Sequence, residues 1–72
     1  MKIKLIVADN VRGYREKAEW TQEKLAAKSG LNSEYLSRLE GGKKNPSVET
    51  IEKIAKAFKV EPNVLLIKQS YK

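Results

Sequence analysis

The sequence of 72 residues contains neither cysteine nor histidine. Disulfide bonds, thiolate chemistry and imidazole metal sites are therefore excluded, together with zinc sites of the usual cysteine and histidine kind. No apolar run approaches the roughly 20 residues that a membrane-spanning helix needs. The amino-terminal segment MKIKLIVADN has a short apolar part and no small-residue cleavage site, so we do not expect a signal peptide. These absences predict a cytoplasmic protein without a metal ion or a cofactor.

The length predicts one domain, residues 1–72, and is too short for a catalytic domain of ordinary size. A chain this small buries only about 60% of the surface that it exposes when unfolded. Its stability therefore depends on well-packed helices or on the association of subunits. The carboxylates fall on predicted helices as partners of basic residues, without a convergent pocket in the pattern. We do not expect an enzyme.

The segment Thr21–Glu40, TQEKLAAKSGLNSEYLSRLE, has the features of two short helices joined by a glycine turn. Thr21 is a good N-cap for the first of these helices, and Asn32 is a strong N-cap for the second. Gly30 stands between them, where a left-handed C-cap is expected, and glycine adopts that conformation without steric cost. In such a unit one helix holds the other rigidly, so that the second can be pushed into a DNA groove.

The second predicted helix of this unit separates its side chains into two faces. Leu36 and Leu39 point one way. Positions i, i+1, i+4 and i+5 share the other face at 3.6 residues per turn. The residues at those positions are Ser33, Glu34, Ser37 and Arg38.

The unit resembles the helix-turn-helix of the Cro and phage-repressor (XRE-type) family, in which the second helix lies in the major groove of DNA. The family's leucine, alanine, glycine and apolar positions are occupied here by Leu25, Ala26, Gly30, Leu31, Leu36 and Leu39. The resemblance continues through GGKKNPSVETIEKIAKAF and covers about residues 6–66. It implies a compact all-α domain of five helices, like the lambda-repressor domain. The alternative is an ordinary helical hairpin with a glycine turn.

Hydrophobic spacing predicts the remaining helices. The first runs from about Leu5 to Lys17, although the alternating residues at 2–7 leave a short amino-terminal strand as an alternative. Ser47 can cap a helix whose apolar residues follow helical spacing from Val48 to Phe58. Pro62 suits the first turn of a last short helix.

The family resemblance places the base-reading residues on the exposed face of the second helix of the unit. Ser33 and Glu34 open this helix, nearest the base edges, where serine can donate or accept and glutamate can accept from cytosine N4. Arg38 can bind guanine O6 and N7 together, and Ser37 is the weakest reader because its small side chain only permits close approach. The alternatives are a favourable charge near the helix amino end for Glu34, and a phosphate contact or surface ion pair for Arg38.

The net charge of +6 favours a polyanionic partner, but residues 21–40 carry three basic and three acidic residues, so the excess lies in the flanks. Phosphate contacts give affinity without sequence information, so a neutral reading unit with basic flanks fits DNA binding. The residues expected at phosphates, chiefly from their family positions, are Gln22, Tyr35, Lys43, Lys44, Asn45 and Arg12. For Tyr35, packing over the unit is the alternative.

Arg15 and Glu40 correspond to positions that form an internal ion pair in similar proteins. We expect this pair to tie the first helix to the end of the reading helix, so the loss of one partner would leave an uncompensated charge. Trp20 is expected in the core rather than as a platform for stacking bases.

An apolar run near the carboxyl end lies in a candidate dimerisation region, about residues 60–72. Its members are Val64, Leu65, Leu66 and Ile67. One small domain can bury part of this run, and the rest can pair across a two-fold axis. That pairing would place two reading helices about 34 Å apart on a palindromic operator. Ile3, Leu5 or Tyr71 could contribute.

Together these features predict a stand-alone, sequence-specific DNA-binding transcriptional regulator, a repressor or autoregulator that reads double-stranded DNA as a homodimer. Such minimal proteins resemble phage repressors, antitoxin-type autoregulators or restriction–modification controllers. No membrane contact or small-molecule ligand is evident. The alternative is a protein–protein interaction module that uses the same fold without reading DNA, since the unit is neutral and Glu34 lies on the reading face.

Overall fold

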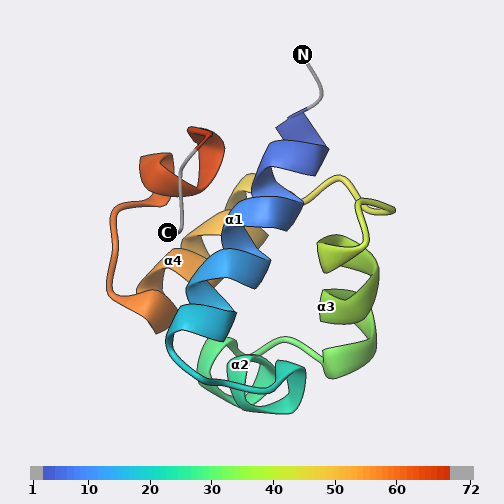
Figure 1. Cartoon of the computed structure of the whole chain (residues 1–72), viewed down its shortest axis with the longest axis vertical. Helices are drawn as coiled ribbons and strands as arrows, with labels where there is room; N and C mark the ends of the chain where they lie inside the picture. The colour runs from blue at the N-terminus through green and yellow to red at the C-terminus, as the bar shows by residue number, and fades with distance from the viewer. Residues whose placement is uncertain (1–2, 69–72) are drawn as a thin grey trace.

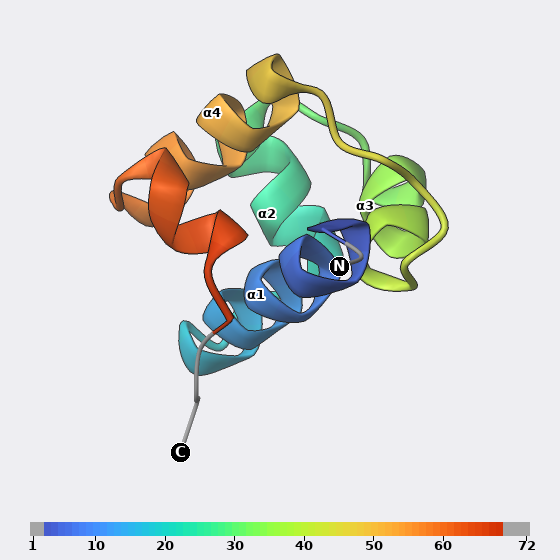
Figure 2. The ribbon, with the colours of Figure 1, turned by 90° about the horizontal axis from the view of Figure 1, so that it is seen from above.

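The computed structural model describes residues 3–68 and arranges them as four α-helices followed by one 3₁₀-helix. In chain order these are α1 (Ile3–Lys17), α2 (Gln22–Ser29), α3 (Ser33–Glu40), α4 (Val48–Phe58) and η1 (Pro62–Leu66). Helix α1 packs against α3 and η1, α2 packs against α3 and α4, and α4 packs against η1 (Figure 1). Seen from above, α2 lies in the middle with α1, α3 and α4 around it (Figure 2). Within the described residues, none of the helices has the length and apolar composition needed to cross a bilayer.

The all-helical prediction is confirmed, but the fifth predicted helix is a 3₁₀ turn and not an α-helix. A segment of five residues is too short to offset the cost of nucleating an α-helix, whereas 3₁₀ turns are common at this length. The alternative of an amino-terminal strand is wrong for the described residues, because Ile3 is already helical. A strand at this place would also need a partner strand, and residues 3–68 contain none. Lys2, at the edge of the alternating segment, lies outside the described residues.

The core draws at least one side chain from each of the five helical segments. The side chains with no solvent exposure are Val7, Val11, Leu25, Leu36, Leu39, Ile54 and Leu65. Burying one apolar side chain of this size contributes about 1.5–3 kcal/mol to the free energy of unfolding. Helix α3 is therefore held mainly by its two buried leucines, Leu36 and Leu39. Val48 departs from the predicted spacing, because it is the first residue of α4 and remains 77% exposed beyond the edge of the core.

Asn10 fixes η1 against α1. This asparagine is 1% exposed in the buried face of α1. Its side-chain nitrogen donates to the carbonyl oxygens of Leu65, at 2.7 Å, and of Ile67, at 2.9 Å. Carbonyl groups at the end of a helix have no partner within that helix, so these bonds satisfy acceptors that would otherwise be buried without one. The docking of η1 on α1 therefore combines an apolar contact with a specific polar one.

Candidate nucleic-acid interface

Local hydrogen bonds build the α2–turn–α3 unit as its sequence predicts. The Thr21 hydroxyl accepts from the Lys24 amide at 3.0 Å, and the Asn32 side-chain oxygen accepts from the Tyr35 amide at 2.7 Å. Gly30 adopts the left-handed conformation, with φ of 77°, and its amide donates to the Ala26 carbonyl at 2.9 Å. The predicted caps of both helices and the glycine turn are therefore confirmed.

Helix α3 is amphipathic, with one face fixed in the core and the other in solvent. Leu36 and Leu39 have no exposure, and both belong to the same core cluster as Leu25 of α2. The predicted base readers occupy the other face: Ser33 is half-buried, whereas Glu34, Ser37 and Arg38 are exposed. The geometry therefore holds a helix rigidly from behind and leaves its polar face open.

Two of these predicted readers meet each other. Nη2 of Arg38 lies 3.2 Å from Oε1 of Glu34, one helical turn away. Their side chains are 55% and 77% exposed, so this is a surface ion pair. Such i, i+4 pairs contribute only about 0.3–0.5 kcal/mol, which a guanine with two acceptors could readily replace.

The residues predicted at phosphates divide into two groups. Lys43, Lys44 and Asn45 are exposed in the segment between α3 and α4, and no ion pair within residues 3–68 engages either lysine. Tyr35 is half-buried against the core, in line with the packing alternative. Gln22 and Arg12 belong to the second group, because both donate hydrogen bonds within the protein.

Gly42 sets the path of the chain that leaves α3. Its φ is +74°, and a Cβ atom at this position would lie 2.6 Å from Cδ2 of Leu5. The turn therefore passes closely over the Leu5 side chain of α1, and its positive φ favours glycine. This close approach fixes the position of the backbone from which the Lys43 and Lys44 side chains extend.

Arg15 and Glu40 form the ion pair expected between α1 and the end of α3. Nε of Arg15 lies 2.7 Å from Oε2 of Glu40, and Nη2 donates to Oε1 at 3.0 Å. Both side chains are largely buried, with 15% and 4% exposed. The hydrogen bond to Glu40 raises the pKa of Arg15, against the opposing effect of desolvation. The guanidinium is therefore held in its charged form.

Other donors complete the network around this ion pair. Nη1 of Arg15 donates to the Trp20 carbonyl at 2.7 Å, and the Gln22 amide donates to Oε1 of Glu40 at 3.2 Å. Arg12 donates to the Glu40 carbonyl at 3.0 Å and also pairs with Asp9 at 2.6 Å. The carboxylate of Glu40 thus joins α1, the start of α2 and the end of α3. The participation of Gln22 was not predicted, since no local sequence signal links residues 18 positions apart.

The predicted dimer surface is divided by the fold. Leu65 does not belong to it, because this side chain has no exposure and lies in the chain's own core. Val64 is half-buried, whereas Leu66 and Ile67 are 39% and 54% exposed. Of the predicted contributors, Ile3 and Leu5 are 43% and 45% exposed, and Tyr71 lies outside the described residues.

Comparison with known proteins identifies the family. The model of a helix-turn-helix family, HTH_3, matches residues 11–65. The chain belongs to this family. The match includes the whole α2–turn–α3 unit, the ion pair between α1 and α3, and most of η1. This agrees with the resemblance to Cro and phage repressors.

Relatives in the HTH_3 family include control proteins of similar size. Control protein C.BamHI of Bacillus amyloliquefaciens is 43% identical over 65 residues, covering 89% of this chain and 80% of that protein. Control protein C.SmaI of Serratia marcescens is 39% identical over 72 residues, which cover 100% of this chain and 86% of that protein. The crystal structure of the restriction-modification controller protein C.AhdI from Aeromonas hydrophila superposes with a TM-score of 0.82 at 34% identity, covering 86% of this chain and 94% of that one.

The family and its members establish the general function. This HTH_3 protein is a DNA-binding transcriptional regulator and not an enzyme. Glu34, Ser37 and Arg38, which were predicted as base readers, lie on the exposed polar face of α3.

Proposed function

We propose that this regulator controls a restriction–modification system by reading a palindromic operator as a homodimer. The observation that carries the DNA-reading part is the exposed polar face of α3, held from behind by the buried leucines. Similarity to the restriction-modification controller protein C.AhdI, together with similarity to control proteins C.BamHI and C.SmaI, supports the biological setting. The proposal places the gene beside that of a DNA methyltransferase. A toxin or integrase gene as its neighbour would count against this setting without affecting the DNA-reading proposal.

Base reading is assigned to the amino-terminal half and middle of α3. Ser33 and Glu34 lie at its start, where side chains reach base edges when a recognition helix enters the major groove. Arg38 follows one turn later, and it must exchange its bond to Glu34 for the two acceptors of a guanine. Glu34, once released, can accept from a cytosine amino group. Ser37, which is exposed between them, allows the DNA to approach closely.

Phosphate binding is assigned to both ends of the α2–α3 unit. The exposed side chains Lys43, Lys44 and Asn45 would hold the backbone on one side. Gln22, the first residue of α2, keeps one amide hydrogen on Glu40 and has a second hydrogen free for a phosphate, next to the positive end of the helix dipole. Arg12 and Tyr35 are secondary candidates, since one is engaged with Asp9 and the other is half-buried.

The homodimer is supported by the apolar residues that the single chain leaves uncovered. Leu66 and Ile67 lie at the end of η1, which Asn10 anchors to α1. A two-fold contact through these side chains would bury them in both subunits at once. Sedimentation that showed only monomer, with and without DNA, would rule this part of the proposal out.

Selection of bound sequences from random DNA, followed by titration of the best sequence over a series of salt concentrations, tests the reading function. We expect enrichment of one palindrome and a steep loss of affinity with salt. Arg38→Ala should weaken binding by about 1–3 kcal/mol and relax the preference at one base pair of each half-site.

Lys44→Gln is the matched control, because it removes an exposed cation without touching α3. It should weaken all sequences alike and reduce the salt slope by about 0.9 for each phosphate that the protein no longer neutralises. Equal weak binding of the unaltered protein to all DNA would overturn the proposal and favour a protein-interaction module. An Arg38→Ala variant with an unchanged base preference would remove Arg38 from the readers.

A further inference from the structure

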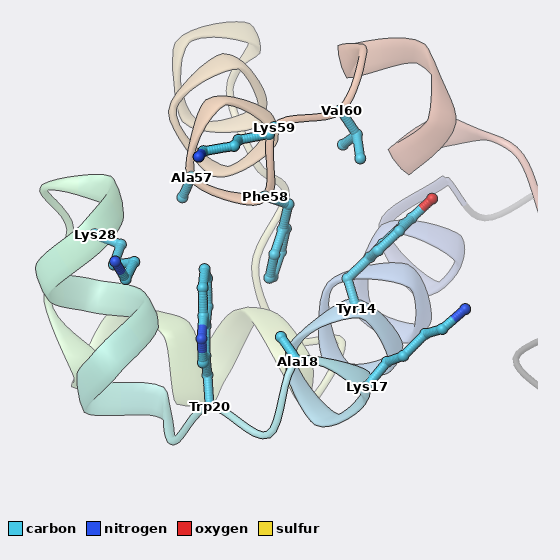
Figure 3. Close-up of a pocket in the computed structure, with 9 residues that line it drawn as sticks. All are labelled: Tyr14, Lys17, Ala18, Trp20, Lys28, Ala57, Phe58, Lys59 and Val60. Atoms are coloured by element: carbon cyan, nitrogen blue, oxygen red, sulfur yellow. The ribbon is translucent and has the colours of Figure 1, made fainter.

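An aromatic and basic cleft lies where α1 and α4 end and α2 passes beside them (Figure 3). No residue of α3 lines it, so it is separate from the proposed reading face. Its volume is about 430 Å³, within the range of roughly 300–1,000 Å³ that is typical of small-molecule sites. Three aromatic residues and three lysines contribute to its wall: Tyr14, Trp20, Phe58, Lys17, Lys28 and Lys59. We call this site the aromatic–lysine cleft.

Trp20 and Phe58 present their edges rather than their faces to the aromatic–lysine cleft, since Phe58 lies between Trp20 and Tyr14, with ring centres 5.4 Å and 5.5 Å away. Lys28 Nζ lies 5.5 Å from the centre of the Trp20 ring, and Phe58 stacks on Trp20 with ring centres 5.4 Å apart and an interplanar angle of 16°. Figure 3 shows Lys28 and Phe58 on opposite sides of Trp20, with Tyr14 beyond Phe58. Both faces of the half-buried indole are thus covered, which leaves its edge for a ligand. Ring edges are electropositive and favour the electron-rich face of another ring.

The cleft carries an excess of positive charge. No carboxylate belongs to its wall, and its lysines are exposed and make no ion pair within residues 3–68. The carboxyl ends of α1 and α4 each contribute about half a negative charge, so the ammonium groups of Lys28 and Lys59, which lie toward the same end of the cleft in Figure 3, leave an excess of about one positive charge. The acidic residues next to the wall in sequence are exposed to water and outside it: Glu16, Glu19 and Glu61.

We propose that the aromatic–lysine cleft binds a small aromatic molecule that carries one acidic group. The ring would lie over the edges of Trp20 and Phe58, and the acid would lie on the side of Lys28 and Lys59, because Figure 3 shows the ammonium of Lys17 at the opposite end of the wall, pointing away from them. The size of the cleft, the electropositive ring edges and the uncompensated ammonium groups all select this class of ligand. The inference does not rest on DNA reading, because it uses no residue of the proposed interface.

A titration of the full chain with benzoate, followed by ¹⁵N–¹H chemical-shift mapping, tests this site. The chain contains a single tryptophan, so the indole N–H of Trp20 gives one unambiguous signal inside the cleft. Benzoate should shift this signal and the backbone amides of the cleft in a saturable manner. Benzamide, which has the same ring without the charge, and acetate, which has the charge without the ring, should each bind at least several-fold more weakly.

Charge variants at matched positions complete the test. Lys59→Gln should weaken benzoate binding about two- to five-fold, the factor expected for one exposed charge interaction. Lys17→Gln should have a smaller effect, because the Lys17 ammonium points away from the other two lysines of the cleft (Figure 3). Lys24→Gln removes another exposed lysine, on α2, that does not line the cleft, and it should leave benzoate affinity unchanged. Shifts that do not saturate, equal binding of benzoate and benzamide, or an equal effect of all three variants would each overturn the proposal.

Discussion

The replacement Arg15→Met tests whether the buried ion pair holds α3, the proposed reading helix, in place. It removes the bonds of 2.7 Å and 3.0 Å to the Glu40 carboxylate and the bond of 2.7 Å to the Trp20 carbonyl. Glu40 would stay 4% exposed, with the Gln22 amide as its remaining side-chain partner. Removing one partner of a buried pair costs about 3–5 kcal/mol. Since Arg15 itself is 15% exposed and water can reach its place, we expect the lower end, about 3 kcal/mol.

A loss of this size is large for so short a chain. A domain of 72 residues has a free energy of unfolding of roughly 4–11 kcal/mol at 0.05–0.15 kcal/mol per residue. Arg15→Met should therefore unfold at a much lower urea concentration, and Trp20 fluorescence and far-ultraviolet circular dichroism should report the same transition. Glu40→Met should lose about 2 kcal/mol, because the arginine left behind is more easily solvated.

The double variant Arg15→Met, Glu40→Met separates the ion pair from simple loss of packing. Replacing both partners by apolar side chains of similar volume is often close to neutral, so its free energy of unfolding should lie within about 1 kcal/mol of the original. Because the two single losses together amount to about 5 kcal/mol, the coupling energy would then be at least about 4 kcal/mol. Arg12→Met is the matched control, since this arginine of α1 also contacts Glu40 but its side chain is 43% exposed. A coupling below about 0.5 kcal/mol, or equal losses for both arginines, would refute the reasoning.

Three further predictions concern stability. Asn10→Leu should lower the free energy of unfolding by about 2 kcal/mol in urea denaturation, because the carbonyls at the end of η1 lose their buried donor. A loss below about 0.5 kcal/mol would mean that water replaces the Asn10 side chain as the donor. Gly42→Ala should lower the melting temperature by about 4–8 °C, since its φ of +74° and the nearby Leu5 oppose a side chain. Gly41→Ala, where φ is −83° and the nearest atom would be 3.4 Å away, should have little effect, and equal shifts for the two variants would contradict this account. Because hydrogen bonding raises the pKa of Arg15, its stabilisation is present below the unfolded pKa and is lost only as pH rises through the folded value, far above neutrality. With no histidine in the chain, the free energy of unfolding should stay constant within about 0.5 kcal/mol between about pH 6 and 8, and a steeper dependence would point to another titrating group.

The features that depend on neighbouring residues could be predicted from the sequence. The caps at Thr21 and Asn32 and the turn at Gly30 involve partners three or four positions away, so residue type and spacing define them. The two faces of α3 follow from helical periodicity in the same way. Arg15 and Glu40 could be named only through the family resemblance, since their contact spans 25 positions.

The features that depend on distant contacts could not be predicted. In the sequence, Asn10 is a polar residue among the apolar residues of α1, and the carbonyl groups that accept its hydrogen bonds lie 55 and 57 positions away. In the apolar run near the carboxyl end, periodicity could not show that Leu65 points inward and Leu66 outward, because a 3₁₀ turn follows a different period from an α-helix. The aromatic–lysine cleft combines the ends of helices that lie far apart in the chain, so composition alone gave no sign of it.

The neutral charge of residues 21–40, which favoured the alternative of a protein-interaction module, has a structural explanation. One of the three carboxylates in this segment, Glu40, is 4% exposed and is neutralised by Arg15, which lies outside the segment on α1. The surface of the segment therefore carries three exposed cations against two exposed carboxylates. One of those carboxylates, Glu34, is paired with Arg38. Binding of a guanine to Arg38 would break this pair, and the released Glu34 could then accept a hydrogen bond from a neighbouring base. A count of charges along the sequence treats Glu40 as repelling DNA, whereas in the fold this carboxylate is buried and orients α3, the helix that we propose to face the DNA.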